Sequence, residues 1–190
     1  MDLEEIEGEV RRGLSEGRLY HSKCVMDKCG ELAVKYNVDV ETAMKVGIAH
    51  DIAKEMTAEE KIEYARLNNI EIDDVEKKFP GLLHTKVGAD IAVQRFGFTD
   101  QMAKAIEAHS TGKENMDMLA KVLYIADWIG LDRNYSDTQY LRELVEEDID
   151  VAIIYSLEQI VKEKFEKKEE IHIDTILARN YLLNKKIINK

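Results

Sequence analysis

The chain has 190 residues, 45% of them hydrophobic, and carries a formal net charge of −11 at pH 7. This length predicts one domain that buries enough surface to fold without a disulfide or a zinc staple. The acidity excludes the simplest nucleic-acid binders, because these need a basic footprint. A phosphorylated ligand would therefore need local help, such as a bound cation.

No apolar run approaches the ~18 residues that a membrane span requires, and the first five residues are acidic where a signal peptide is basic. We therefore expect a cytoplasmic protein with no membrane partner. Cys24 and Cys29 lie five residues apart in a predicted helix, on nearly opposite faces, so they cannot bridge each other. We expect both to be buried apolar residues in a reducing compartment.

Apolar residues recur at helical spacing in chain order, for example from Cys29 to Tyr36 and from Ile153 to Val161. Thr57, followed three residues later by Glu60, is a capping box that marks a helix start. Sustained period-2 alternation, the strand pattern, is absent, and so are linkers and repeats. The sequence therefore predicts an all-α single domain. Its predicted helices span residues 2–15, 18–36, 40–54, 58–68, 82–96, 100–109, 117–130, 138–166 with a break near Glu147, and 173–187.

Four histidines fall on separate predicted helices, beside small, acidic or hydroxyl residues. They are His21, His50, His84 and His109, and Asp51 follows the second of them directly. Each histidine alone could be a hydrogen-bonded core or surface residue. For the whole set we favour a metal site, because helical bundles build such sites from side chains on facing helices.

Asp127 lies inside the apolar run Val122–Ile129. An ionised carboxylate there would be desolvated unless it is paired or binds a metal. The alternative is a buried carboxylate that accepts hydrogen bonds from the backbone or from Lys121.

The order of these residues resembles the signature of the HD-domain phosphohydrolase superfamily, which is His, then His-Asp, then a distant Asp around one or two divalent metals. The matching residues are His21, His50-Asp51, His84, His109 and Asp127. The segments around them, and the tail Ile171–Asn180, resemble the YqeK family of bacterial HD hydrolases. Two departures stand out. Gly130-Leu131-Asp132 precedes Arg133 where the family usually carries Glu-Pro, and Ile173 replaces the proline that commonly follows the tail histidine.

The resemblance implies a single HD domain over residues 1–190, with a core at about 18–130 and C-terminal helices at about 138–190 that complete the pocket. It also implies a hydrolase that splits diadenosine tetraphosphate symmetrically into two ADP by metal-activated water. The resemblance favours iron, whereas imidazole and carboxylate ligands alone would also suit Mn, Co, Ni or Zn. The implied partner is a small-molecule nucleotide, with no nucleic acid, and a homodimer is left open.

Residue roles follow from the matched positions. The hypothesis is that one metal binds His21, His50, Asp51 and Asp127, that a second binds His84 and His109, and that Asp51 bridges the two. Asp51 and Lys54 are the expected catalytic residues, although Lys54 could equally be a surface lysine at a helix end. The expected substrate-binding residues are Lys54, Arg133, His172 and Thr175, and the alternative for His172 is a structural role.

Three other functions stay open on the sequence. Within the same superfamily, the reaction could be that of a 5′-nucleotidase, a nucleoside triphosphate hydrolase or a nucleotide phosphodiesterase. A non-catalytic nucleotide-sensing HD module is a less favoured reading, because all six ligand positions are filled. A metal-storage or electron-transfer bundle is disfavoured, since the repeated Glu-x-x-His motifs on paired helices that ferritin-like carboxylate sites use are missing.

Overall fold

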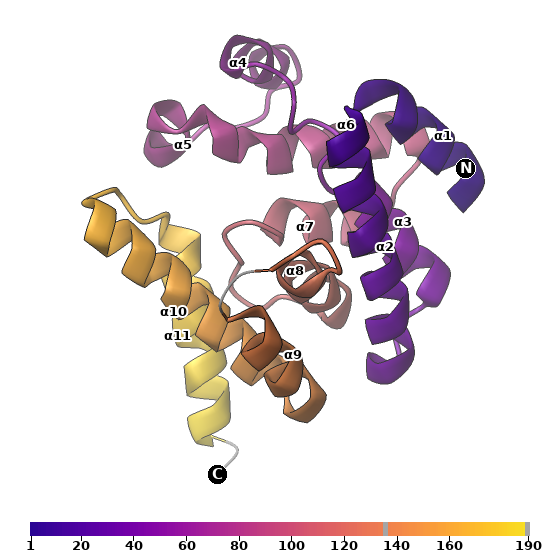
Figure 1. Ribbon diagram of the computed structural model, residues 1–190. Helices are drawn as coiled ribbons and strands as arrows, with labels where there is room; N and C mark the ends of the chain where they lie inside the picture. Colours follow the sequence, from indigo (N-terminus) through magenta and orange to yellow (C-terminus); the bar gives the residue numbers. More distant parts are fainter. Residues whose placement is uncertain (135–136, 189–190) are drawn as a thin grey trace.

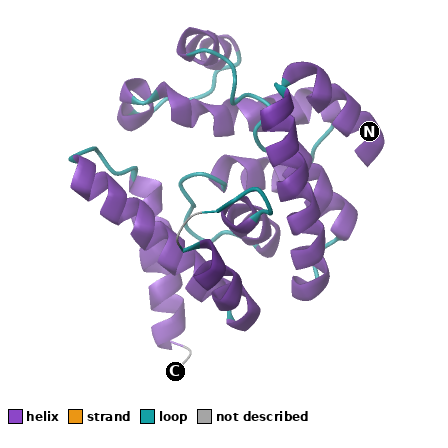
Figure 2. Ribbon diagram, in the orientation of Figure 1, coloured by secondary structure: helices purple, strands orange, loops and turns teal. Residues whose placement is uncertain are grey.

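The computed structural model describes residues 1–134 and 137–188, and within these ranges helices are joined by loops and turns, with no strand (Figure 2). The all-α prediction is confirmed for this part of the chain. No helix among the described residues has both the length and the apolarity to cross a membrane. The elements in chain order are α1 (Leu3–Gly13), α2 (Glu16–Tyr36), α3 (Val40–Ala49), α4 (Ala58–Leu67), α5 (Asp74–Lys78), the 3₁₀ turn η1 (Pro80–Leu83), α6 (His84–Phe96), α7 (Asp100–Ala108), α8 (Met118–Ile129), α9 (Thr138–Glu147), α10 (Ile149–Lys167) and α11 (Ile173–Ile188).

The end of α3 corrects the sequence prediction, which ran one helix from residue 40 to 54. The helix stops at Ala49, and the chain continues through turns in which Ile52 N–H donates to Ala49 O and Lys54 N–H donates to Asp51 O. These bonds reach back three residues instead of four, so the backbone leaves the α-helix at His50. Asp51 and Lys54 therefore sit in a tight turn after the helix.

The short helix α5 is absent from the sequence prediction, because five residues are too few to show a helical period. Its start does carry a signal, since Asp73 and Glu76 form a capping box. The break near Glu147 is confirmed, because α9 ends there and Asp148 caps α10. Cys24 and Cys29 are both buried and unbridged, as expected.

Helix α8 lies in the middle of the bundle and contacts α2, α3, α7, α9 and α10 (Figure 1). Its residues Leu123, Tyr124 and Ile125 are completely buried. The C-terminal helices α10 and α11 pack against each other, and α10 also packs against α8. Helix α8 is therefore surrounded by several other helices.

Two close approaches position the segments that carry the histidines. Gly47 of α3 lies so near α2 that a Cβ there would be 2.7 Å from the Cα of Met26. This contact brings the rings of His21 and His50 to a centroid separation of 5.3 Å. A second, small apolar cluster, of Ala53, Leu83 and Val87, ties the turn after α3 to η1 and α6, and so sets Asp51 beside His84.

Candidate metal centre

Three histidines are held in the same way at helix ends. In each, ring Nδ1 lies within hydrogen-bond distance of the carbonyl oxygen three residues earlier, and because a carbonyl can only accept, Nδ1–H is the donor. A carbonyl oxygen has two lone pairs, so the oxygens of Gly81 and Ile106 accept both the ring N–H and the backbone N–H of the same histidine. The tautomer is thereby fixed, and every Nε2 keeps a free lone pair, as a metal ligand requires. The bonds run from His50 to Gly47 (2.8 Å), from His84 to Gly81 (2.7 Å) and from His109 to Ile106 (2.7 Å).

Asp51 lies at the centre of the histidines and turns one carboxylate oxygen to each side. Oδ1 is 3.2 Å from Nε2 of His84 and 3.6 Å from Nε2 of His109. Oδ2 is 3.5 Å from Nε2 of His50 and 3.9 Å from Nε2 of His21. The structure therefore brings all four predicted histidines to one buried aspartate.

Asp127 joins the cluster from α8, with Oδ1 3.1 Å from Nε2 of His21. Arg133 also pairs with this carboxylate and donates from Nε to the backbone oxygen of Asp127 at 2.7 Å. The alternative in which Lys121 pairs with Asp127 is wrong, because Lys121 Nζ donates to Asp150 at 2.5 Å. The carboxylate in the apolar run thus faces the histidines.

The donor atoms fit a bound cation. His50 Nε2 and Asp51 Oδ1 are buried and have no hydrogen-bond partner within residues 1–134 and 137–188. Nε2 of His84 lies 3.1 Å from Nε2 of His109, so two lone pairs face each other beside the Asp51 carboxylate. Lys54 Nζ lies 3.0 Å from His84 Nε2, but no donor comes within hydrogen-bond distance of His50 Nε2 or Asp51 Oδ1 among the described residues, and buried acceptors are costly unless a positive charge lies among them. Two sets have ligand atoms all within 4.8 Å of one another, namely His21, His50 and Asp127, and His50, Asp51 and His109.

The electrostatics leave most of these groups ready to coordinate at neutral pH. Burial lowers the pKa of His50 and of His84 to about 4, so both rings are neutral. Burial alone would raise the pKa of Asp51, but the surrounding imidazoles, His50 first, outweigh it and hold that pKa far below its usual range. The pKa of Asp127 is likewise depressed, because the hydrogen bond to His21 outweighs its burial.

His21 is the exception, and it reveals a residue that the sequence analysis missed. Asp132 Oδ2 lies 2.8 Å from Nδ1 of His21, while Asp127 lies at Nε2. Burial would lower the pKa of His21, but the two carboxylates outweigh it and raise that pKa above its ordinary value. The signal for Asp132 was its place in the Gly130-Leu131-Asp132 departure from the family pattern. Arg18 was also missed, and its guanidinium donates to Asp51 Oδ2 at 2.9 Å from one turn before His21 on α2.

The predicted substrate-binding residues divide into two groups. Lys54 and Arg133 reach the cluster, since Lys54 Nζ is 3.0 Å from His84 Nε2 and Arg133 Nη2 is 3.3 Å from His21 Nε2. His172 and Thr175 lie outside it. They line a pocket of about 430 Å³ that meets the cluster at Lys54 and His84.

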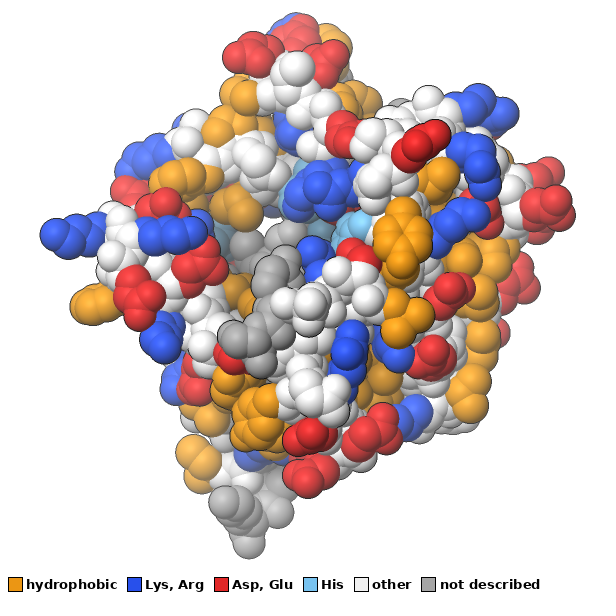
Figure 3. All heavy atoms as spheres, viewed as in Figure 1, with side chains coloured by type: hydrophobic (Ala, Val, Ile, Leu, Met, Phe, Trp, Pro, Cys, Tyr) orange, Lys and Arg blue, Asp and Glu red, His pale blue; other side chains and the backbone are white. Residues whose placement is uncertain are grey.

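A hollow in the middle of one face of the molecule shows histidine atoms on its floor with Lys and Arg side chains beside them (Figure 3). Besides the pocket of about 430 Å³, a pocket of about 410 Å³ meets the cluster at His109 and Asp127. A separate acidic and histidine group, Asp73, Glu76 and His172, lies at the start of α5. There Glu76 already pairs with Lys86 at 2.7 Å, so its acceptors are satisfied within the protein.

Comparison with known protein families identifies the family of the chain that carries this cluster. The family model described as HD domain matches residues 18–132, the stretch from α2 through α8 that carries all six cluster residues. The chain belongs to the HD domain family.

Relatives of this HD-domain chain match it over nearly its whole length. It is 30% identical to a protein of Bacillus subtilis (strain 168) named "Bis(5'-nucleosyl)-tetraphosphatase, symmetrical", over 97% of this chain and 99% of that protein. A Halalkalibacterium halodurans protein of the same name is 32% identical, over 92% and 93% of the two chains. A crystal structure of a predicted HD superfamily hydrolase involved in NAD metabolism, from Clostridium acetobutylicum, superposes with a TM-score of 0.94 at 34% identity, covering 97% of this chain and 98% of that one. The predicted resemblance and fold class are confirmed.

Proposed function

We propose that this HD-domain chain is a metal-dependent hydrolase that splits dinucleoside tetraphosphates, such as diadenosine tetraphosphate, symmetrically into two nucleoside diphosphates. The observation that carries the proposal is the buried set of imidazole and carboxylate acceptors around Asp51. The substrate comes from the relatives, since the Bacillus subtilis protein named as a symmetrical tetraphosphatase is 30% identical over nearly the full length.

In this proposal one divalent cation is held by His21, His50, Asp51 and Asp127, and a second by His84 and His109 with Asp51 bridging. The support is that Asp51 presents Oδ2 to the first pair of histidines and Oδ1 to the second. The resemblance favours iron, and a donor set of nitrogen and oxygen without thiolate also suits Mn, Co, Ni or Zn. When bound, such cations lower the pKa of a coordinated water and neutralise charge on a phosphate.

Cationic side chains of the chain itself gather at the same place. Arg18 and Lys54 lie 2.9 Å and 3.6 Å from opposite oxygens of Asp51, and Arg133 pairs with Asp127. They make the local charge far less negative than the −11 of the whole chain, which lets a polyphosphate approach. We assign Lys54 to a phosphate at the His84 side of the cluster. We assign Arg133 to a phosphate on the other side, where its planar fork matches two phosphoryl oxygens.

The C-terminal helices complete the site in this proposal, so that residues 1–190 form a single HD domain. The support is the pocket of about 430 Å³, which combines Lys54 and His84 with Ile160 of α10 and Thr175 of α11. His172 and Thr175 are thereby proposed to contact the nucleotide part of the substrate.

Metal analysis tests the site independently of turnover. Protein purified without chelator should contain at least one first-row transition metal per chain by plasma mass spectrometry. His50→Ala should lose most of it, because it removes a ligand shared by both acceptor sets. His172→Ala is the matched control, since it changes a histidine in the separate group at α5 and should keep the metal. Wild-type protein without metal, or equal loss in both variants, would contradict the assignment.

A further inference from the structure

The two pockets that meet the cluster have different walls. We call the one of about 410 Å³ the Arg133 pocket; it is lined by His109, Ser110, Asp127, Trp128, Arg133 and Glu163. The other, of about 430 Å³, is here the Phe79 pocket, and it shares Ser110 and Glu163 with the first. Both volumes fall in the range of about 300 to 1,000 Å³ that is usual for small-molecule sites.

The Phe79 pocket changes character along its length. Where it meets the cluster it is lined by Lys54 and His84, and the remaining wall includes four apolar side chains. These are Val75, Phe79, Leu82 and Ile160. The wall also carries the charged side chains Glu163, Lys164 and Glu170. The cationic inner end and the four apolar side chains match a nucleoside diphosphate, whose phosphates are anionic and whose base has apolar faces. Phe79 is 37% exposed as a residue, which leaves part of its side chain open to a base, and Lys164 Nζ lies 5.8 Å from its ring centroid.

The Arg133 pocket offers much less to a base. Among the described residues that line it, Trp128 is the one apolar side chain, and the others are charged or polar. Trp128 is also partly buried against the core, which limits the ring area that a ligand can reach. A symmetrical substrate would therefore meet two unlike surroundings.

The walls of the Phe79 pocket are tied together before any ligand arrives. His172, in the segment between α10 and α11, has its Nε2 2.8 Å from Asp73 Oδ2 at the start of α5. The backbone N–H of Asp174 donates to Nδ1 of the same ring at 3.2 Å, so Nε2–H is the donor to Asp73. Both ring nitrogens are engaged, so His172 fixes the pocket wall in place while its side chain also lines the pocket. A pre-formed wall lowers the entropy lost on binding.

We propose that the Phe79 pocket holds the base and ribose of one half of the substrate and that this half alone anchors it, while the other half lies toward the Arg133 pocket without base recognition. This inference rests on the proposed function. One nucleoside should then suffice for cleavage. Adenosine 5′-tetraphosphate should be split at the bond between its second and third phosphorus atoms, with one water consumed, to give ADP and pyrophosphate.

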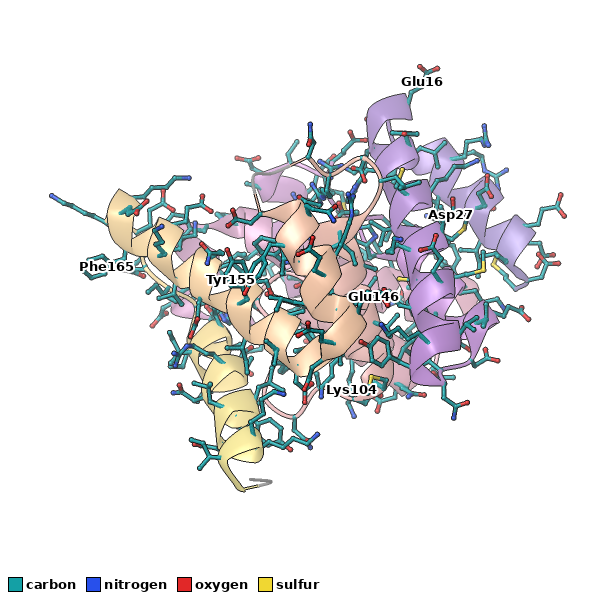
Figure 4. All side chains as sticks on the ribbon, turned by 60° about the horizontal axis from the view of Figure 1, so that its bottom comes forward. Glu16, Asp27, Lys104, Glu146, Tyr155 and Phe165 are labelled. Carbon is teal, nitrogen blue, oxygen red and sulfur yellow. The ribbon has the colours of Figure 1, made fainter. Side chains whose placement is uncertain are left out.

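The binding test compares the metal-loaded wild type with Phe79→Ala, Phe79→Tyr and Phe165→Ala, with ADP as the probe in isothermal titration calorimetry. Stacking of a base on an aromatic ring predicts a rise of about 5- to 150-fold in the Kd of ADP for Phe79→Ala, and recovery in Phe79→Tyr. Phe165 is the matched control, because it is 79% exposed near the end of α10, outside the Phe79 pocket (Figure 4). Unchanged ADP affinity in a folded Phe79→Ala variant would overturn the assignment.

The turnover test compares diadenosine tetraphosphate with adenosine 5′-tetraphosphate on the same preparations. We expect kcat/KM values within tenfold of each other, and Phe79→Ala should lower both by the same factor. A larger deficit for the single-nucleoside substrate would show that both bases are recognised and would overturn the inference. The proposed function fails separately, if the wild type does not convert diadenosine tetraphosphate into ADP.

Discussion

Replacing Gly47 by alanine tests whether α2 and α3 pack directly against each other at this position. The added Cβ would lie 2.7 Å from Met26 Cα and 3.1 Å from Cys29 Sγ. The nearest atom belongs to the backbone, so the clash is relieved only if the two helices separate. Because the clash is with backbone, we take the upper part of the range for overpacking, about 2–3 kcal/mol, from which the better helix propensity of alanine returns about 1 kcal/mol. The expected net loss of about 1–2 kcal/mol lowers the melting temperature by roughly 2–8 °C for a chain of this size.

The assay is thermal unfolding of metal-free protein followed by circular dichroism. Gly8→Ala is the matched control, because Gly8 lies inside α1 and a Cβ there meets nothing within 4 Å. Alanine at position 8 should leave the melting temperature unchanged or raise it, since it favours the helix without a clash. If Gly47→Ala behaved like Gly8→Ala, the reasoning that α2 and α3 touch through Gly47 would be refuted.

The other predictions concern the protonation and orientation of the cluster. Asp132→Ala should weaken Mn²⁺ binding about 10- to 100-fold in calorimetric titration, because His21 loses the partner that orients its ring. The control Asp100→Ala, which removes an exposed ion pair with Lys104, should leave the affinity unchanged. Equal Mn²⁺ affinities of the two variants would contradict this prediction. Metal binding near pH 7 should release protons from His21, because its pKa is raised and a metal ligand must be unprotonated. Calorimetric titrations in buffers of different ionisation enthalpy measure this release, and no proton release would mean that the His21 ring is already neutral. Metal-free protein should lose stability as the pH falls from about 6.5 to about 4, by roughly 3 kcal/mol each for His50 and His84, because the unfolded chain binds protons there that the folded one excludes. The raised pKa of His21 acts in a separate window, since its contribution is present below pH 6.5 and is lost as the pH rises through that pKa; urea midpoints that stay constant from pH 6.5 to 4 would refute the burial argument.

The cluster could be predicted from the sequence because its His and Asp residues recur at intervals that no other feature of the chain explains. His50, His84 and His109 could be predicted as a set, and the structure shows that each is fixed by its own helix end. For His50, that detail depends on where α3 ends. The sequence predicts this end at residue 54, five residues beyond its observed position at Ala49. Helical spacing continued past His50, whereas the backbone turned there, and periodicity alone does not register such a turn.

What the sequence missed are contacts between distant segments. Asp132 meets His21 across 111 residues, and although the departure from the family pattern marks Asp132, its neighbours in sequence do not indicate His21 as its partner. The helix α5 was missed because it is short, yet its start at Asp73 holds His172 across 99 residues. Both contacts come from tertiary packing, which local pattern does not encode.

The most direct measurement is product analysis by anion-exchange chromatography after anaerobic, iron-loaded protein has acted on diadenosine tetraphosphate, beside an Asp51→Asn control. Asparagine keeps the shape of the side chain but removes the charge that faces all four histidines. ADP as the sole product in the wild type, with turnover lost in the folded Asp51→Asn variant, is the predicted result. ATP together with AMP, or equal turnover in the two proteins, would contradict it.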